Sequence, residues 1–126
     1  MQAYLLVGLG GGVGAMCRYG FGVMVGRLHS GLFPLGTFGV NVIGSLLMGL
    51  LIGFLARTTP EWQPEARLLL ATGLLGGFTT FSAFSLDVVT LIERGSLITA
   101  ALYAVASMIL AVLALFIGMW LTRSVF

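Results

Sequence analysis

The C-terminal part of the chain reads LITAALYAVASMILAVLALFIGMWLTR over residues 97–123, and its only charged residue is the last one. About 20 apolar residues are enough for a helix to cross a hydrocarbon core of about 30 Å. A helix on the surface of a soluble protein shows a polar face, and this stretch shows none. We therefore predict that the segment spans a membrane.

Three further apolar segments precede it, at about residues 4–28, 34–56 and 66–94. Of the 126 residues, 59% are hydrophobic and 8% are charged, whereas a soluble domain carries about 25% charged residues. Pro34 favours a helix start, and Gly95 favours a helix end. The sequence predicts an all-α integral membrane protein whose residues 1–126 form a single transmembrane domain of four helices.

Four crossings place both termini on one side of the membrane. Arg57, Arg67 and Arg123 fall on that side, and Arg27 and Arg94 fall on the other. Because the two sides differ by only one arginine, the positive-inside rule favours neither orientation strongly. We therefore expect insertion in both orientations and an antiparallel homodimer. The 19 glycines, many at small-xxx-small spacing, also favour close packing and association of helices.

The third segment contains the densest polar cluster within an apolar stretch. Gly76 and Gly77 lower helix propensity, and Thr79 and Thr80 follow them. We expect the helix to break here, near the middle of the membrane, where such breaks accompany ion sites built from backbone carbonyls. A kink that serves close packing is the alternative.

Beyond the expected break, Phe81 and Phe84 lie three residues apart and share a helical face. Thr79, Ser82 and Ser85 follow the same spacing and would form an adjoining hydroxyl stripe. Ring edges carry the positive end of the aromatic quadrupole, and hydroxyls donate hydrogen bonds. The pattern suits a path for an anion, although core or lipid contact explains the rings equally simply.

Three further polar residues lie inside apolar stretches. Asn41 either bonds to a neighbouring helix or donates to a passing anion. Arg18 either pairs with Asp87 or raises the anion concentration in an aqueous vestibule. The sequence offers no nucleophile with a base and no metal-ligand cluster, so we do not expect an enzyme.

Three strings resemble the CrcB/Fluc family of fluoride channels: GGFTTFSAFS at 76–85, GTFGVN at 36–41 and GAMCRY at 14–19. The resemblance covers essentially the whole chain. It implies a dual-topology, antiparallel homodimer in the bacterial inner membrane, with two fluoride pathways and a structural Na⁺ at its centre. The implied role is passive export of fluoride from the cytoplasm.

The resemblance also implies roles for individual residues. The backbone carbonyls of Gly76 and Thr79 match the Na⁺ ligands, and Arg18 falls in the vestibule. The positions that match the fluoride pathway are Asn41, Thr80, Phe81, Ser82, Phe84, Ser85 and Tyr103. Ala83 replaces the middle hydroxyl of the family's polar track and removes one donor.

Two other classes of protein remain as alternatives. A small four-helix proton-coupled drug exporter would carry a membrane-embedded acid in its first helix, where this chain has Arg18 and no acid. A noncatalytic assembly subunit would explain the glycines, but not the polar and aromatic cluster of the third segment.

Overall fold

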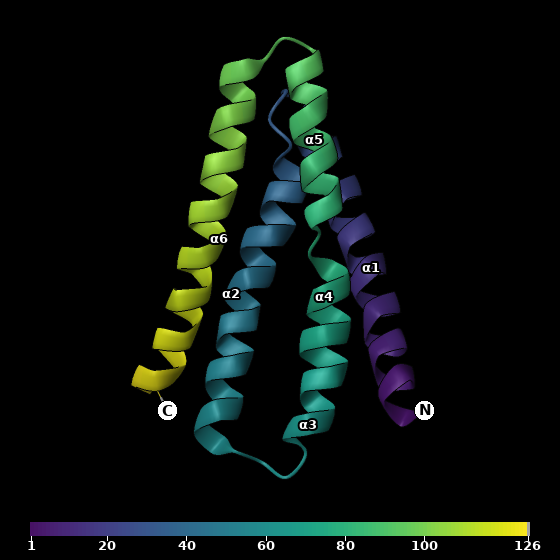
Figure 1. Ribbon diagram of the computed structural model, residues 1–126, viewed down its shortest axis with the longest axis vertical. Helices are drawn as coiled ribbons and strands as arrows, with labels where there is room; N and C mark the ends of the chain where they lie inside the picture. The colour runs from purple at the N-terminus through teal and green to yellow at the C-terminus, as the bar shows by residue number, and fades with distance from the viewer. Residues whose placement is uncertain (126) are drawn as a thin grey trace.

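The computed structural model describes residues 1–125, which form helices joined by short connections, with no strand among them. The prediction of an all-α chain is confirmed for these residues. The elements in chain order are α1 (Gln2–Leu28), α2 (Leu35–Thr58), α3 (Gln63–Ala66), the π-helix η1 (Arg67–Leu75), α4 (Gly76–Phe78), α5 (Phe81–Glu93) and α6 (Leu97–Val125). Figure 1 shows an elongated bundle with both termini at the end where α2 connects to α3.

Three stretches of helix are long and apolar enough to cross a membrane: Leu35–Thr58, Gln63–Glu93 and Leu97–Val125. Together with the exposed apolar surface they describe a multi-pass membrane protein. The glycine-rich α1 is 27 residues long but does not belong to this set. A fourth crossing by α1 therefore stays a prediction.

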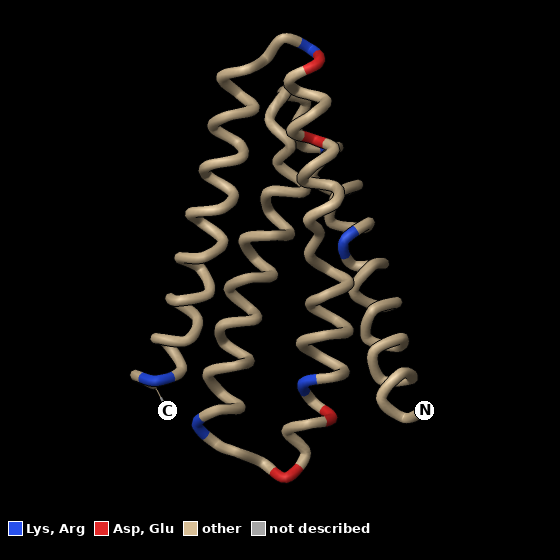
Figure 2. The backbone as a smooth tube through the Cα atoms, in the orientation of Figure 1, with Lys and Arg blue, Asp and Glu red and all other residues tan. Residues whose placement is uncertain are grey.

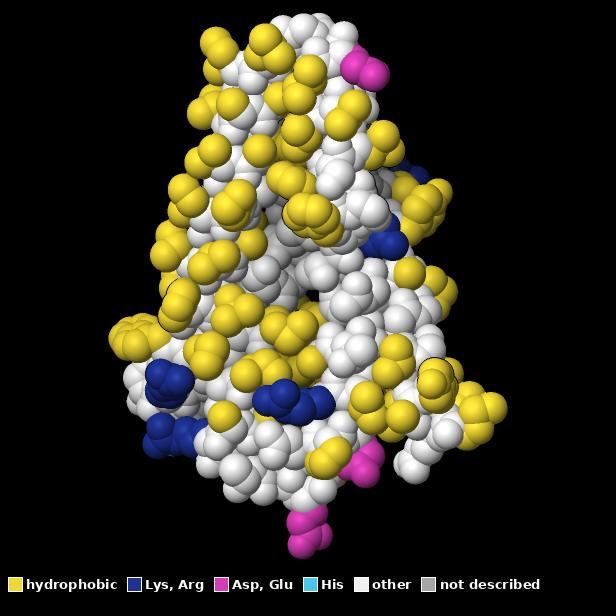
Figure 3. Space-filling view, in the orientation of Figure 1, with side chains coloured by type: hydrophobic (Ala, Val, Ile, Leu, Met, Phe, Trp, Pro, Cys, Tyr) yellow, Lys and Arg dark blue, Asp and Glu magenta, His cyan; other side chains and the backbone are white. Residues whose placement is uncertain are grey.

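Large hydrophobic side chains lie mainly on the outside of the bundle. Trp120, Phe116 and Tyr4 are exposed, and Figure 3 shows hydrophobic side chains along much of the molecular surface. Charged residues gather mostly near the two ends of the bundle (Figure 2). A surface of this kind suits contact with lipid along the length of the helices.

Glycines allow the helices to approach each other closely. A Cβ atom at Gly10 would overlap the Leu69 carbonyl oxygen, and one at Gly14 would overlap that of Leu74. These positions therefore serve packing of α1 against η1 within one subunit. Gly8 and Gly12, on another face of α1, have no atom within 4 Å of such a Cβ.

The segment expected to break within the glycine and threonine cluster of residues 76–80 is interrupted at its threonines. Gly76–Phe78 are α-helical, and Thr79 and Thr80 have extended backbone, with ψ of 159° and 126°. The interruption therefore lies within the predicted cluster of residues 76–80, at its threonines and not at its glycine pair. Gly77 is needed for packing instead, because a Cβ there would lie 2.5 Å from the Gly11 carbonyl oxygen.

Candidate functional site

The side chain of Asn41 on α2 pairs with the backbone of Thr80 in the helix interruption. Asn41 Nδ2 donates to the Thr80 carbonyl oxygen at 2.9 Å, and the Thr80 N–H donates to Asn41 Oδ1 at 2.8 Å. The amide therefore satisfies both backbone groups of one residue, as a neighbouring strand would. Because an amide nitrogen carries two N–H groups, one donor of Asn41 remains beyond this pair.

The two threonines end one helix and begin the next. Thr79 donates from both its N–H and its Oγ1 to the Leu75 carbonyl oxygen, at 3.0 and 2.9 Å. Thr80 Oγ1 accepts from the Ala83 N–H at 3.1 Å and so caps the N-terminus of α5. Local hydrogen bonds of this kind explain why the interruption occurs at the threonines and not at the glycines.

These bonds remove the usual helical donors from two carbonyls. In a continuous helix the Thr80 N–H would donate to Gly76, and the Ala83 N–H would donate to Thr79. Both donors are bound elsewhere, to Asn41 Oδ1 and to Thr80 Oγ1. The carbonyl oxygens of Gly76 and Thr79 are thereby left without those partners.

The freed carbonyls suit a hard cation, which prefers oxygen ligands. No group of three or more His, Cys, Asp or Glu side chains that could hold a metal occurs in residues 1–125. The predicted ligands Gly76 and Thr79 fit this chemistry.

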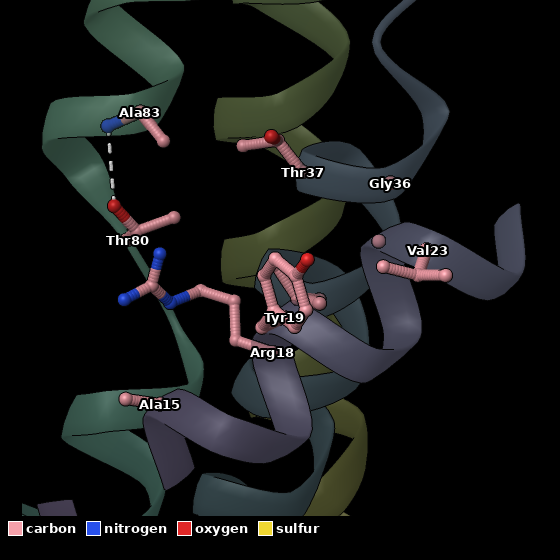
Figure 4. Close-up of a pocket in the computed structure, with 10 residues that line it drawn as sticks. Ala15, Arg18, Tyr19, Val23, Gly36, Thr37, Thr80 and Ala83 are labelled. Carbon is pink, nitrogen blue, oxygen red and sulfur yellow. Dashed lines mark hydrogen bonds between the residues drawn. The ribbon is translucent and has the colours of Figure 1, made fainter. Parts of the chain in front are cut away.

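Two cavities lie beside Thr80, which lines both. The first has a volume of about 460 Å³, and its lining includes Arg18, Thr37 and Ala83. Figure 4 shows the Arg18 guanidinium extending from α1 toward Thr80. The structure therefore places Arg18 in a cavity, as the vestibule prediction requires, and Ala83 contributes a methyl group to its wall.

The second cavity, of about 420 Å³, brings together four predicted pathway residues, namely Thr80 of the interruption and three residues from two helices. Asn41 of α2 lines it together with Phe81 and Phe84 of α5. The two ring centroids are 5.5 Å apart, and Phe81 is 79% exposed. Two aromatic residues, an asparagine and the threonines of the interruption thus border one space.

Ser107 of α6 also lines the second cavity and was missed in the sequence. Its side chain is buried, and its Oγ has no hydrogen-bond partner. A buried hydroxyl without a partner is costly and points to a missing acceptor or donor. The available signal was its position, four residues after Tyr103 in an otherwise apolar stretch.

The predicted hydroxyl stripe is only partly reproduced. Thr79 lies outside α5, so the stripe on that helix contains Ser82 and Ser85 alone. Ser82 Oγ is 3.3 Å from Thr80 Oγ1, and Ser85 Oγ donates to the Phe81 carbonyl at 3.0 Å. Neither serine lines the two cavities beside Thr80.

Tyr103 of α6 is completely buried behind Phe84. Its ring centroid lies 5.2 Å from that of Phe84, and its hydroxyl donates to Asp87 Oδ2 at 2.9 Å. Arg18 Nε donates instead to the Gly77 carbonyl oxygen at 3.1 Å. The structure therefore provides separate partners for Arg18 and Asp87 rather than a salt bridge between them.

Comparison with known proteins agrees with the resemblance seen in the three sequence strings. A family model described as CrcB-like protein, Camphor Resistance (CrcB), matches residues 5–119. The chain belongs to the CrcB family. The match spans α1 and most of α6, so it covers every residue of the candidate site.

Curated relatives of this CrcB chain carry the name of an ion channel. One from Hyphomonas neptunium, "Fluoride-specific ion channel FluC", is 52% identical over 126 residues, which are 100% of this chain and 99% of the relative. One from Phenylobacterium zucineum with the same name has the same identity and coverage. One from Nitrobacter hamburgensis, "Fluoride-specific ion channel FluC 2", is 52% identical over 95% of this chain and 96% of its own. These names describe channels rather than enzymes or drug exporters.

Proposed function

We propose that this chain is a fluoride-selective channel for passive export of fluoride from the bacterial cytoplasm across the inner membrane. The observation that carries the proposal is the cavity shared by Asn41, Phe81, Phe84 and Ser107. The names of its full-length relatives support the same ion.

The lining of this cavity suits the chemistry of fluoride. Fluoride is small, strongly hydrated and able only to accept hydrogen bonds, so a pore must replace its water with compact donors. Asn41 offers a second N–H, and Ser107 offers an unpartnered hydroxyl. Phe81 offers an exposed aromatic residue, and the edge of such a ring carries the positive end of its quadrupole. None of these groups carries a full charge, so the ion is not held too firmly to leave.

Arg18 contributes from the neighbouring cavity. A guanidinium there raises the local concentration of anions. Because Arg18 does not line the cavity of Phe81 and Phe84, its charge would attract fluoride without trapping it at the rings.

We further propose that the working unit is an antiparallel homodimer with two pathways, each built from both subunits. Phe81 is 79% exposed in the single chain although it lines the candidate pathway. A second copy would enclose this ring and complete the wall of the cavity. The weak charge bias between the two ends supports insertion in both orientations.

A structural Na⁺ at the centre of this dimer is the third part of the proposal. Gly76 and Thr79 would hold it through the carbonyl oxygens that lack helical donors, with matching oxygens from the second copy. When bound, the ion supplies positive charge that offsets the loss of water from fluoride. Arg18 occupies the Gly77 carbonyl and so restricts which oxygens remain for the cation.

Fluoride efflux from liposomes tests the channel function. Purified protein is reconstituted with potassium fluoride inside, and valinomycin is added to relieve the charge imbalance while an electrode records external fluoride. We expect rapid fluoride release and no release of chloride in a parallel experiment. Fluoride retention by liposomes that contain monodisperse protein would contradict the proposal, and proton-driven uptake of a cationic dye would favour an exporter.

A further inference from the structure

We propose that Asn41 is a positioning residue for the cation site, in addition to any contact it makes with fluoride. The amide captures the Thr80 N–H and thereby keeps the Gly76 carbonyl oxygen free to bind the cation. This inference rests on the Na⁺ site of the proposed function.

The first step of the argument is a competition for one backbone donor. Thr80 lies four residues after Gly76, and Gly76–Phe78 already have helical backbone. Without another acceptor, the Thr80 N–H would find the Gly76 carbonyl by continuing the helix. A backbone N–H at membrane depth needs an acceptor, and the Gly76 carbonyl oxygen and Asn41 Oδ1 are the two protein oxygens that compete for it.

The second step is that Asn41 offers the stronger alternative. Continuing the helix would bond the Thr80 N–H to Gly76 and would leave the Asn41 amide without its two Thr80 partners. Asn41 pairs with both the N–H and the carbonyl of Thr80, at 2.8 and 2.9 Å. Two hydrogen bonds to an amide on α2 thus stabilise the extended backbone conformation of Thr80.

The third step is that α2 also makes room for this backbone. Gly44 lies one helical turn after Asn41, on the same face. A Cβ atom at Gly44 would overlap the methyl group of Thr79. One face of α2 therefore supplies an amide for Thr80 and a gap for Thr79, and both features favour the interrupted form.

Two substitutions separate this positioning role from a role as a fluoride donor. Asn41→Leu removes both bonds to Thr80 and lets its N–H turn to Gly76. Asn41→Asp loses the amide donor but keeps an oxygen that accepts from the Thr80 N–H, so Gly76 stays free. Ser45→Ala is the matched control, because Ser45 lines the same cavity one turn further along α2.

The experiment measures how Na⁺ stabilises the purified dimer in detergent. Sodium chloride is exchanged for N-methyl-D-glucamine chloride at constant ionic strength, and the thermal unfolding midpoint is followed. We expect Asn41→Leu to raise the Na⁺ concentration needed for half of the stabilisation by about tenfold or more, equivalent to about 1.4 kcal/mol. Asn41→Asp and Ser45→Ala should stay near wild type, while fluoride flux falls in both Asn41 variants.

Hydrogen exchange at the Thr80 amide keeps the proposal testable if Asn41→Leu does not fold. In Asn41→Asp, a protected Thr80 amide with near-wild-type Na⁺ stabilisation supports the proposal, whereas a protected amide without Na⁺ stabilisation overturns it. An unchanged Na⁺ response in folded Asn41→Leu also overturns it and leaves the channel proposal intact. If Na⁺ does not change the unfolding midpoint of wild-type dimers, the proposed cation site is contradicted. The liposome assay tests fluoride conduction separately.

Discussion

Arg18 is tied to Gly77 by a hydrogen bond of 3.1 Å from Nε to the carbonyl oxygen, across the contact between α1 and α4. The bond fixes one edge of the guanidinium at the helix interruption. The other N–H groups of the fork remain on the side of the cavity that Thr37 and Thr80 line. A positive charge is thus held at a fixed place beside the proposed pathway, without an acid to neutralise it.

Replacing Arg18 should reveal whether its charge or its hydrogen bond matters. Arg18→Gln keeps a donor for Gly77 but removes the charge, so fluoride flux should fall by about tenfold at low ionic strength and by less in high salt. Arg18→Lys keeps the charge and should retain more of the flux. The measurement is liposome efflux at two concentrations of an impermeant salt. Equal losses of flux in the Gln and Lys variants at both salt concentrations would contradict a role for the charge.

Tyr103→Phe should destabilise the protein while leaving its fold intact. The substitution keeps the ring against Phe84 but removes the hydroxyl that donates to Asp87. Leaving a partly buried acceptor unsatisfied costs about 1–3 kcal/mol. The resistance of the detergent-solubilised protein to thermal aggregation measures this loss. Tyr4→Phe is the control, because Tyr4 is exposed; equal stability of the two variants would show that the Asp87 bond contributes little.

Two glycines of α1 should respond differently to alanine. A Cβ at Gly14 meets the backbone of Leu74 and Phe78, which cannot rotate away, so Gly14→Ala should cost about 1–3 kcal/mol. Gly12 has open space, and Gly12→Ala should be neutral or gain up to about 1 kcal/mol from helix propensity. Thermal stability of the two purified variants checks the difference. A dimer lost in Gly12→Ala would instead place this open face in the contact between subunits.

The sequence predicted the all-α chain and apolar helices long enough to cross a membrane. These features were predictable because a helix that crosses lipid needs about 20 mostly apolar residues, and this property belongs to each segment by itself. A local signal also predicted the end of a helix. Gly95, which was expected to end the third segment, has a φ of 78° and lies just beyond the end of α5.

Features that depend on distant partners were not predictable in this way. The sequence left the partner of Asn41 open, because Thr80 lies 39 residues away and only the fold brings it near. Low helix propensity indicated a break within residues 76–80, and the hydrogen bonds of the threonines decide where in this cluster it occurs. The π-helical stretch η1 had no signal in the composition, and Ser107 became a candidate only when its hydroxyl was seen to be unpartnered.

The rings of Phe81 and Phe84 should govern fluoride throughput, but only one of them should matter for stability. Phe81→Ile and Phe84→Ile nearly preserve hydrophobicity while removing the ring edge, so both should cut fluoride flux sharply. Phe84 also packs against Tyr103, with ring centroids 5.2 Å apart. Phe84→Ile should therefore lower thermal stability as well, whereas the exposed Phe81 tolerates the change in a single chain.

The matched control for Phe81 is Phe116→Ile on α6, because Phe116 is 65% exposed, against 79% for Phe81, and does not line the cavity of Asn41. A general effect of losing an exposed ring would reduce flux equally in Phe116→Ile and Phe81→Ile. A pore role predicts wild-type flux in the first and a large loss in the second, with unchanged dimers on size exclusion in both. Wild-type fluoride efflux in Phe81→Ile and Phe84→Ile would contradict a pore role for these rings, because no step of conduction would then depend on their edges.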